Sequence, residues 1–111
     1  MSKSMLLVLT NPVPGKEAEF EAWYEQQHVP EVLDIPGYVA ASRWKKSHLV
    51  WPSGRPSVDQ SRAALYTVEG DLEEAINALT SRVADGTIVL PDCIDIESIG
   101  ITPYEFISDT E

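Results

Sequence analysis

His28 is the side chain of this sequence best suited to proton transfer near neutral pH, because an imidazole titrates in that range. The chain has one other histidine, His48, and only His28 follows closely after two large aromatic residues, Trp23 and Tyr24. Tyr24 lies four residues before His28, so in a helix its phenol is a neighbour of the imidazole. We predict that His28 and Tyr24 are catalytic, with His28 transferring a proton and a tyrosine polarising a substrate carbonyl.

The charge state of His28 depends on how its helix ends. Pro30 lacks an N–H and disfavours a helical residue before it, so the helix is expected to break around His28. A helix C-terminus and the carboxylates of Glu25 and Glu31 would favour the imidazolium, whereas burial against aromatic rings would oppose it. These opposed effects predict a His28 pKa near the working pH. The alternative is a histidine that caps the helix end and does no chemistry.

Five further side chains are predicted to bind the substrate. Tyr66 lies on an expected central strand and, like Tyr24, can donate from its hydroxyl. Arg43 and Trp44 are neighbours on an expected strand, so only one of them can face the helices. For Tyr66 and Trp44, the alternative is a role in packing. The predicted substrate-binding residues are Trp23, Arg43, Trp44, Trp51 and Tyr66.

The motifs of cofactor and metal sites are absent from the sequence. It has no His-x-His or His-x-x-x-His pair, and Cys93 is its only cysteine. It also lacks a phosphate loop, a dinucleotide fingerprint and a nucleophile elbow. A metal site from Glu25, His28 and Glu31, and haem ligation by His28 or His48, are the alternatives. We predict that the protein needs no metal and no cofactor.

The excess of acidic residues limits the partners. The chain has 18 acidic and 8 basic residues and a formal net charge of -10, whereas nucleic acids and anionic membranes both require a basic surface. We therefore expect a small-molecule ligand, and neither nucleic acid nor a membrane as a partner. The apolar run at residues 5–9 is too short for a signal peptide or a membrane span. With a single cysteine, this predicts a cytoplasmic protein.

The elements that must position these residues follow the order βαββαβ within a single domain, residues 1–111. Residues 49–61 show no periodicity and predict a long loop. The expected elements are a strand at 5–9, a helix from 16 to about 28, strands at 37–46 and 62–68, a helix capped by Asp71 and ended by Gly86, and a strand within 94–107. The apolar stripe of the first helix is Phe20, Trp23, Tyr24 and Gln27. One face of the second strand is Tyr38, Ala40, Ser42 and Trp44.

This order predicts an α+β, ferredoxin-like fold with a four-stranded antiparallel sheet and two helices on one face. The other face of the sheet needs a cover, and a second copy of the sheet is the simplest one. Isoleucines add apolar surface to the expected edge strand, which favours association. These are Ile94, Ile96, Ile99 and Ile101. We therefore predict a homodimer that closes into a barrel.

Several short segments follow one another as in a known family pattern. They are Trp23-Tyr24, His28-Val29-Pro30-Glu31, Pro36-Gly37-Tyr38, Ala41-Ser42-Arg43-Trp44 and residues 64–71. Together they resemble the EthD-like branch of the dimeric α+β barrel proteins, over most of the chain outside residues 49–61. The resemblance implies the dimeric barrel. Its functional implication is broad, because relatives include cyclases, dehydratases, isomerases, quinone-forming monooxygenases, haem-degrading enzymes and proteins without known activity.

We predict a cofactor-independent lyase, isomerase or cyclase that acts by acid-base chemistry on a small, partly aromatic carbonyl compound. The first alternative is a non-catalytic small-molecule binding or accessory protein of a catabolic pathway. The second alternative is a cofactor-free monooxygenase of a phenolic substrate. Neither the substrate nor the choice among these classes follows from the residues alone.

Overall fold

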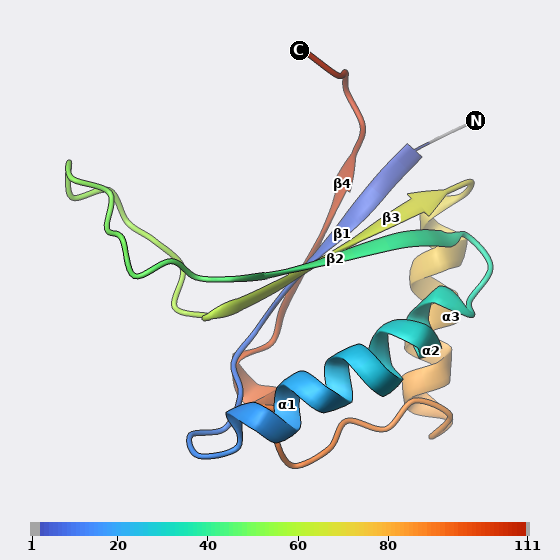
Figure 1. Cartoon of the computed structure of the whole chain (residues 1–111). Helices are drawn as coiled ribbons and strands as arrows, with labels where there is room; N and C mark the ends of the chain where they lie inside the picture. The colour runs from blue at the N-terminus through green and yellow to red at the C-terminus, as the bar shows by residue number, and fades with distance from the viewer. Residues whose placement is uncertain (1–2, 111) are drawn as a thin grey trace.

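The computed structural model describes residues 3–110, and its elements follow the predicted order βαββαβ. The four strands form one antiparallel sheet in the order β2-β3-β1-β4. Figure 1 shows the helices on one face of this sheet. The elements are β1 (Lys3–Thr10), α1 (Glu17–Trp23), the π-helical turn η1 (Tyr24–His28), α2 (Val29–Leu33), β2 (Tyr38–Lys45), β3 (Arg62–Glu69), α3 (Leu72–Ala84), the 3-10 turn η2 (Ile96–Ser98) and β4 (Gly100–Glu105). The predicted α+β, ferredoxin-like fold is confirmed.

The first helix does not break at His28, so that prediction was wrong. The elements α1, η1 and α2 form one helical run from Glu17 to Leu33. In a regular α-helix, the ring of Pro30 would collide with the carbonyl of Gln26. The π-helical turn before Pro30 widens the helix at this point, and the Val29 N–H donates to the carbonyl five residues back. The chain therefore continues through the proline.

The extra residue in the π-helical turn changes which side chains face inward. Phe20 and Tyr24 are buried as predicted, but Gln27 is exposed. His28 takes the inward position instead, and its ring stacks on that of Trp23 with centroids 4.6 Å apart. The predicted apolar stripe is therefore wrong at its last position, because it assumed a constant α-helical period.

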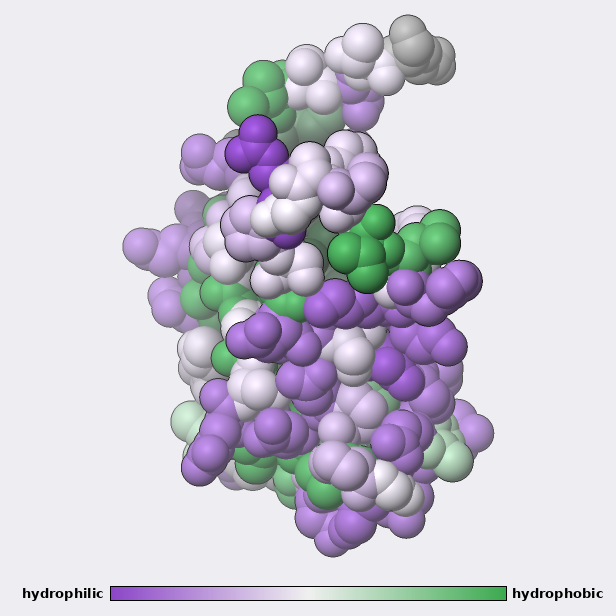
Figure 2. Space-filling view, turned by 90° about the vertical axis from the view of Figure 1, so that its left-hand side faces the viewer, coloured by the Kyte–Doolittle hydropathy of each residue, from purple (hydrophilic) through white to green (hydrophobic). Residues whose placement is uncertain are grey.

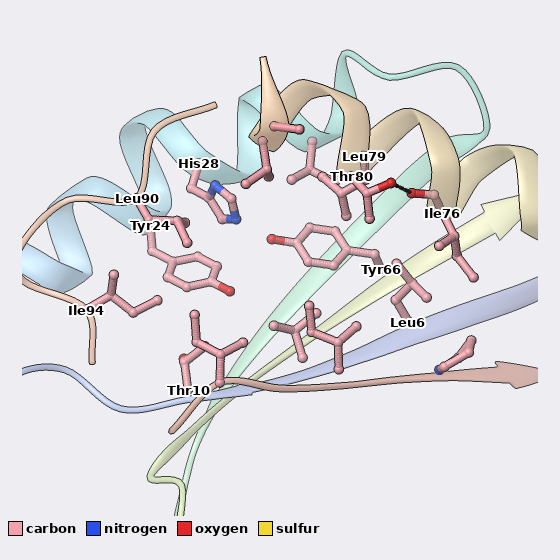
Figure 3. Close-up of a pocket in the computed structure, with 17 residues that line it drawn as sticks. Leu6, Thr10, Tyr24, His28, Tyr66, Ile76, Leu79, Thr80, Leu90 and Ile94 are labelled. Carbon is pink, nitrogen blue, oxygen red and sulfur yellow. Dashed lines mark hydrogen bonds between the residues drawn. The ribbon is translucent and has the colours of Figure 1, made fainter. Parts of the chain in front are cut away.

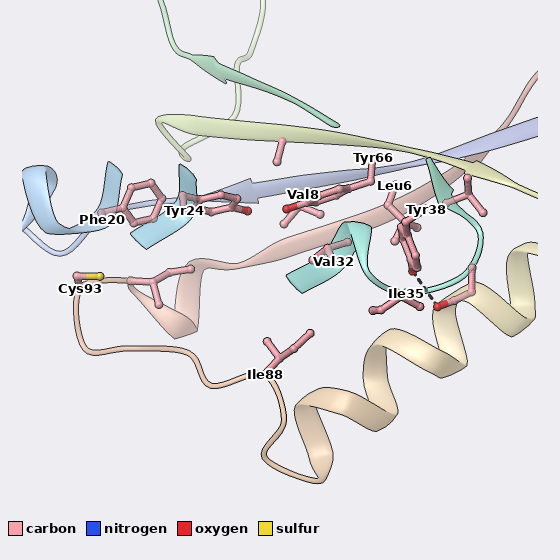
Figure 4. Close-up of a cluster of buried hydrophobic side chains, with 14 residues drawn as sticks. Leu6, Val8, Phe20, Tyr24, Val32, Ile35, Tyr38, Tyr66, Ile88 and Cys93 are labelled. Atoms are coloured by element: carbon pink, nitrogen blue, oxygen red, sulfur yellow. Dashed lines mark hydrogen bonds between the residues drawn. The ribbon is translucent and has the colours of Figure 1, made fainter. Parts of the chain in front are cut away.

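The two central strands, β1 and β3, carry the core on the face that the helices cover. Leu6 and Val8 of β1 and Tyr66 and Val68 of β3 are buried there, as Figure 4 shows for the first three. The opposite face of β1 is only partly buried within the described chain. The predicted central position of Tyr66 is confirmed.

A register shift in β2 decides which of its side chains face the helices. Between Tyr38 and Ala40 the pairing with β3 slips by one residue, and such a bulge reverses the alternation of the faces. Tyr38 therefore shares the helix-covered face with Arg43, and Trp44 lies on the opposite face with Ala40. The predicted common face of Tyr38 and Trp44 was wrong. Of the neighbours Arg43 and Trp44, the arginine faces the helices.

Helix α3 is capped as predicted but lies only loosely against the sheet. The Asp71 carboxylate accepts from the Glu74 N–H at 2.9 Å, and Gly86 ends the helix with a φ of +84°. Ala75 is its buried residue, and the Ala75 carbonyl accepts a hydrogen bond from the Tyr38 hydroxyl at 2.8 Å. Further along α3, the side chains of Ile76, Leu79 and Val83 line a cavity between the helix and the sheet.

Residues 46–61, here called the arm, extend away from the rest of the chain between β2 and β3 (Figure 1). The predicted long loop is confirmed. Leu49, Val50 and Trp51 of the arm are strongly exposed. Figure 2, which views the molecule from the side of the arm, shows hydrophobic patches among mainly hydrophilic side chains.

The fourth strand, β4, lies within the predicted range of residues 94–107. Of the four isoleucines, only Ile101 lies in β4, whereas Ile96 lies in η2. Ile94 is buried and pairs with Pro12 as an isolated bridge, so it adds nothing to the surface. Among the helices of residues 3–110, none is long and apolar enough to cross a bilayer.

Candidate functional site

A cavity of about 600 Å³ lies between the helix-covered face of the sheet and α3 (Figure 3). Most of its wall is apolar, with side chains such as Leu6, Ile76, Leu79 and Leu90. No lysine, arginine, aspartate or glutamate of the described chain lines it. The volume lies within the usual range of small-molecule sites, and the wall suits an uncharged ligand.

Three of the predicted site residues meet at one end of this cavity. Tyr24 and His28 come from η1, and Tyr66 comes from β3 on the opposite wall. Figure 3 shows the two hydroxyls and a ring nitrogen of His28 directed toward one another. The rings of Tyr24 and His28 are edge to face with centroids 5.1 Å apart. The structure therefore brings together the predicted catalytic pair and one predicted substrate-binding tyrosine.

Two residues that line the cavity, Thr10 and Tyr66, each carry a buried hydroxyl without a hydrogen-bond partner in residues 3–110. An unpaired buried group costs about 1–3 kcal/mol, which a ligand with a matching polar group would offset. Sequence reasoning missed Thr10, although it continues the buried alternation of Leu6 and Val8 along β1. The buried side-chain atoms without a partner in residues 3–110 include Thr10 Oγ1, Trp23 Nε1, His28 Nδ1, Glu31 Oε1 and Tyr66 Oη.

Burial sets the protonation of the three polar groups. It lowers the pKa of His28 from 6.5 to about 4, because a charged imidazolium is poorly solvated in this setting. The expected pKa near the working pH was wrong, since it relied on a helix end that does not exist here. Burial also raises the pKa of Tyr24 and of Tyr66. At neutral pH the site therefore holds one proton acceptor, His28, and two phenols that can donate hydrogen bonds.

Trp23 and Arg43 lie behind the cavity and support its rings. Trp23 stacks on His28 at an interplanar angle of 20°. The Arg43 guanidinium lies 4.5 Å from the centre of the Tyr24 ring, and it donates to Glu21 at 2.7 Å and to Glu25 at 3.0 Å. Neither side chain lines the cavity. Trp23 packs against His28 and Arg43 packs against Tyr24, and these two residues do line it.

Trp44 and Trp51 do not reach this cavity. Trp44 is 60% exposed on the opposite face of the sheet, and its indole N–H donates to Ser42 at 2.9 Å. Trp51 is 70% exposed in the arm. In residues 3–110, no three histidine, cysteine, aspartate or glutamate side chains are grouped so that they could hold a metal ion.

The fold and the cavity define the class of this protein: a ferredoxin-like α+β protein with a ligand-sized cavity between sheet and helices. Two solved structures share the fold across 100% of this chain and 99% of their own. One is a "putative monooxygenase" from Shewanella loihica PV-4, with a TM-score of 0.54 and 17% identity. The other is a dimeric ferredoxin-like protein from an uncultured marine organism, with a TM-score of 0.54 and 15% identity. No family model and no curated protein matches the chain.

Proposed function

We propose that this protein is a cofactor-independent lyase, isomerase or cyclase of the EthD-like branch, acting on a small, partly aromatic carbonyl compound. One observation carries the proposal. A neutral imidazole and two protonated phenols, those of His28, Tyr24 and Tyr66, meet in a cavity whose wall is mostly apolar. A base and hydrogen-bond donors at one point are what the enolisation of a carbonyl compound requires.

In the proposed reaction, His28 takes a proton from a carbon next to the substrate carbonyl. The electrons of that C–H bond move onto the carbonyl oxygen, which becomes an enolate. The Tyr66 hydroxyl has no partner in residues 3–110, so it is free to donate to that oxygen, and Tyr24 lies beside it. The imidazolium then returns the proton to another atom of the substrate or to a leaving group. The apolar wall strengthens these interactions by excluding water.

The same cavity could hold a ligand without any chemistry, and its largely apolar wall favours that second candidate function. A phenolic substrate that reacts with oxygen would occupy it in a similar way. The three functions differ in what happens to the hydrogen beside the carbonyl and in whether oxygen is consumed.

To test the proposal, neutral aryl ketones and hydroxyaryl carbonyl compounds should be compared with carboxylate analogues of the same size. We expect the neutral compounds to bind at least about 10-fold more tightly, because the cavity has no cation to pair with a carboxylate. We also expect the protein to exchange the hydrogen beside the carbonyl for deuterium in D2O, measured by NMR. Tight binding without exchange or product would support the binding function, and oxygen consumption would support the monooxygenase.

The homodimer is part of the same proposal. The face of the sheet opposite the helices carries Met5, Leu7, Leu65 and Trp44, and no described element covers it (Figure 1). The dimeric relative supports a second copy as the cover. We expect light scattering to give a dimer at micromolar concentration, with roughly 2,000 Å² or more buried in total.

A matched pair of variants locates that interface. Leu65→Asp places a charge at the centre of the open face, so we expect it to shift the dimer toward monomer. Leu33→Asp changes a partly exposed leucine at the end of α2 and should leave the dimer intact. A wild-type monomer at micromolar concentration would contradict the closed barrel.

A further inference from the structure

Glu31 lies one helical turn after His28 and faces it. Glu31 Oε1 is 3.9 Å from His28 Nδ1, and both atoms are buried without a hydrogen-bond partner in residues 3–110. The two side chains are largely shielded, with 12% of His28 and 25% of Glu31 exposed. A donor and an acceptor that are both unpaired and this close are natural partners for each other, because buried polar groups are rarely left unpaired.

Other acidic side chains of the same helical run are engaged elsewhere. Glu21 binds both Arg43 and Arg62, and Glu25 binds Arg43. The other titratable groups that face His28 are the phenols of Tyr24 and Tyr66, which approach from the cavity (Figure 3). Glu31, which does not line the cavity, is thus the carboxylate placed to act on the imidazole.

The position of one hydrogen decides what His28 can do. A neutral imidazole carries its hydrogen on either Nδ1 or Nε2, and the other nitrogen holds the lone pair. A carboxylate accepts hydrogen bonds and cannot donate them, so a carboxylate beside Nδ1 favours the hydrogen on Nδ1. Nε2 then presents its lone pair to the cavity. In hydrolases, a buried aspartate fixes the tautomer of a catalytic histidine in this way.

We propose that Glu31 is a positioning residue, which holds the hydrogen on Nδ1 of His28 so that Nε2 faces the substrate as the base. The 3.9 Å separation exceeds a normal N–H···O distance by about 1 Å, so a direct hydrogen bond requires a rotation of the Glu31 side chain. When Nε2 takes the substrate proton and the electron pair of the C–H bond moves to the carbonyl oxygen, Glu31 also stabilises the imidazolium. The effect on rate rests on the proposed function, whereas the tautomer does not.

The tautomer can be measured directly by ¹⁵N NMR of the His28 ring in the ligand-free protein at neutral pH. We expect the wild type to carry the hydrogen on Nδ1. Glu31→Leu should lose that preference, and Glu31→Gln should keep part of it, because the amide oxygen still accepts. Glu19→Leu removes an exposed carboxylate from the start of the same helix and should change nothing. The result that overturns the proposal is a wild-type hydrogen on Nε2, or an unchanged Nδ1 hydrogen in Glu31→Leu.

Kinetics give the second readout. In the deuterium-exchange assay, Glu31→Leu should lower kcat/KM by about 10-fold or more, Glu31→Gln should lower it less, and Glu19→Leu should not lower it. If the tautomer shifts as expected but the wild type exchanges no hydrogen, the proposed function fails and the role of Glu31 in positioning His28 stands. If exchange occurs in the wild type and survives in Glu31→Leu at full rate, Glu31 does not serve the reaction. Circular dichroism of each variant confirms that it is folded.

Discussion

Replacing His28 with asparagine should give a folded protein that still binds its ligand but turns it over about 10²-fold more slowly or worse. Asparagine is polar and fits the space of the imidazole, but it cannot accept a proton. The stack on Trp23 is lost as well, which costs about 1 kcal/mol of folding free energy. The deuterium-exchange assay measures the loss, and ligand-induced thermal stabilisation checks that binding persists.

The pH dependence of the wild type should show the same group. Burial lowers the pKa of His28 to about 4, so kcat/KM should be level around neutral pH and fall in acid as the base becomes protonated. The asparagine variant should lose that acid limb. If turnover and the acid limb both survived the substitution, His28 would not be the base, and Tyr24 and Tyr66 would be the next candidates.

The free energy of unfolding should also fall in acid because of His28. Between pH 4 and 6.5 the unfolded state binds a proton on this residue and the folded state does not, so stability rises with pH across this window. The difference of about 2.5 pH units corresponds to about 3 kcal/mol, which is fully present above 6.5 and lost by about pH 4. His28→Asn should lack this contribution. His48 is exposed in the arm, so His48→Asn should retain it.

The order of the elements was predictable because it depends on local patterns that the structure preserves. Asp71 and Gly86 mark the two ends of α3 by their own backbone preferences, whatever the helix packs against. Tyr66 lies on the expected third strand, and the third strand of a βαββαβ fold is a central one. The structure has β3 between β2 and β1. This order brings Tyr24 and Tyr66 to the same cavity, whereas the inward position of His28 depends on the π-helical turn.

Two backbone irregularities were not predictable from residue preferences. Pro30 favours a helix break when it is considered alone, but a π-helical turn lets the helix continue and turns His28 inward. The bulge after Tyr38 turns Trp44 away from the helices. Each inserts one residue into a regular period, and every side chain beyond it changes face. Such an insertion depends on the packing of the whole layer and leaves no signal in the local sequence.

The electrostatics of the site also required coordinates. The sequence placed Glu25 and Glu31 at equal spacing on either side of His28, and nothing in it showed that Glu25 binds Arg43 while Glu31 faces the imidazole. The direction of the shift in the His28 pKa also required coordinates, because it depends on how the helix continues past His28. Burial was expected to compete with a helix end, and because the helix continues, burial lowers the pKa of His28.

Tyr66 and Tyr38 are both buried, and removing their hydroxyls should have opposite effects on stability. Tyr66 Oη has no partner in residues 3–110, so Tyr66→Phe should raise the free energy of unfolding by about 1 kcal/mol, because it removes an unsatisfied group. The Tyr38 hydroxyl donates to the Ala75 carbonyl at 2.8 Å. Tyr38→Phe removes that hydrogen bond and should lower the free energy of unfolding by about 1 kcal/mol. Urea unfolding measures both.

Activity should not follow stability in these two variants: the more stable Tyr66→Phe should lose turnover, and the less stable Tyr38→Phe should keep it. Tyr66 lies at the polar end of the cavity, and losing one donor to a developing enolate typically slows turnover by about 10²-fold or more. The Tyr38 hydroxyl is directed to α3 and does not line the cavity, so Tyr38→Phe should keep its rate despite its lower stability. A gain in stability with a loss of turnover would identify Tyr66 as a group kept for ligand chemistry. If Tyr66→Phe were less stable than the wild type and equally active, its hydroxyl would have a structural partner, and carbonyl polarisation would pass to Tyr24.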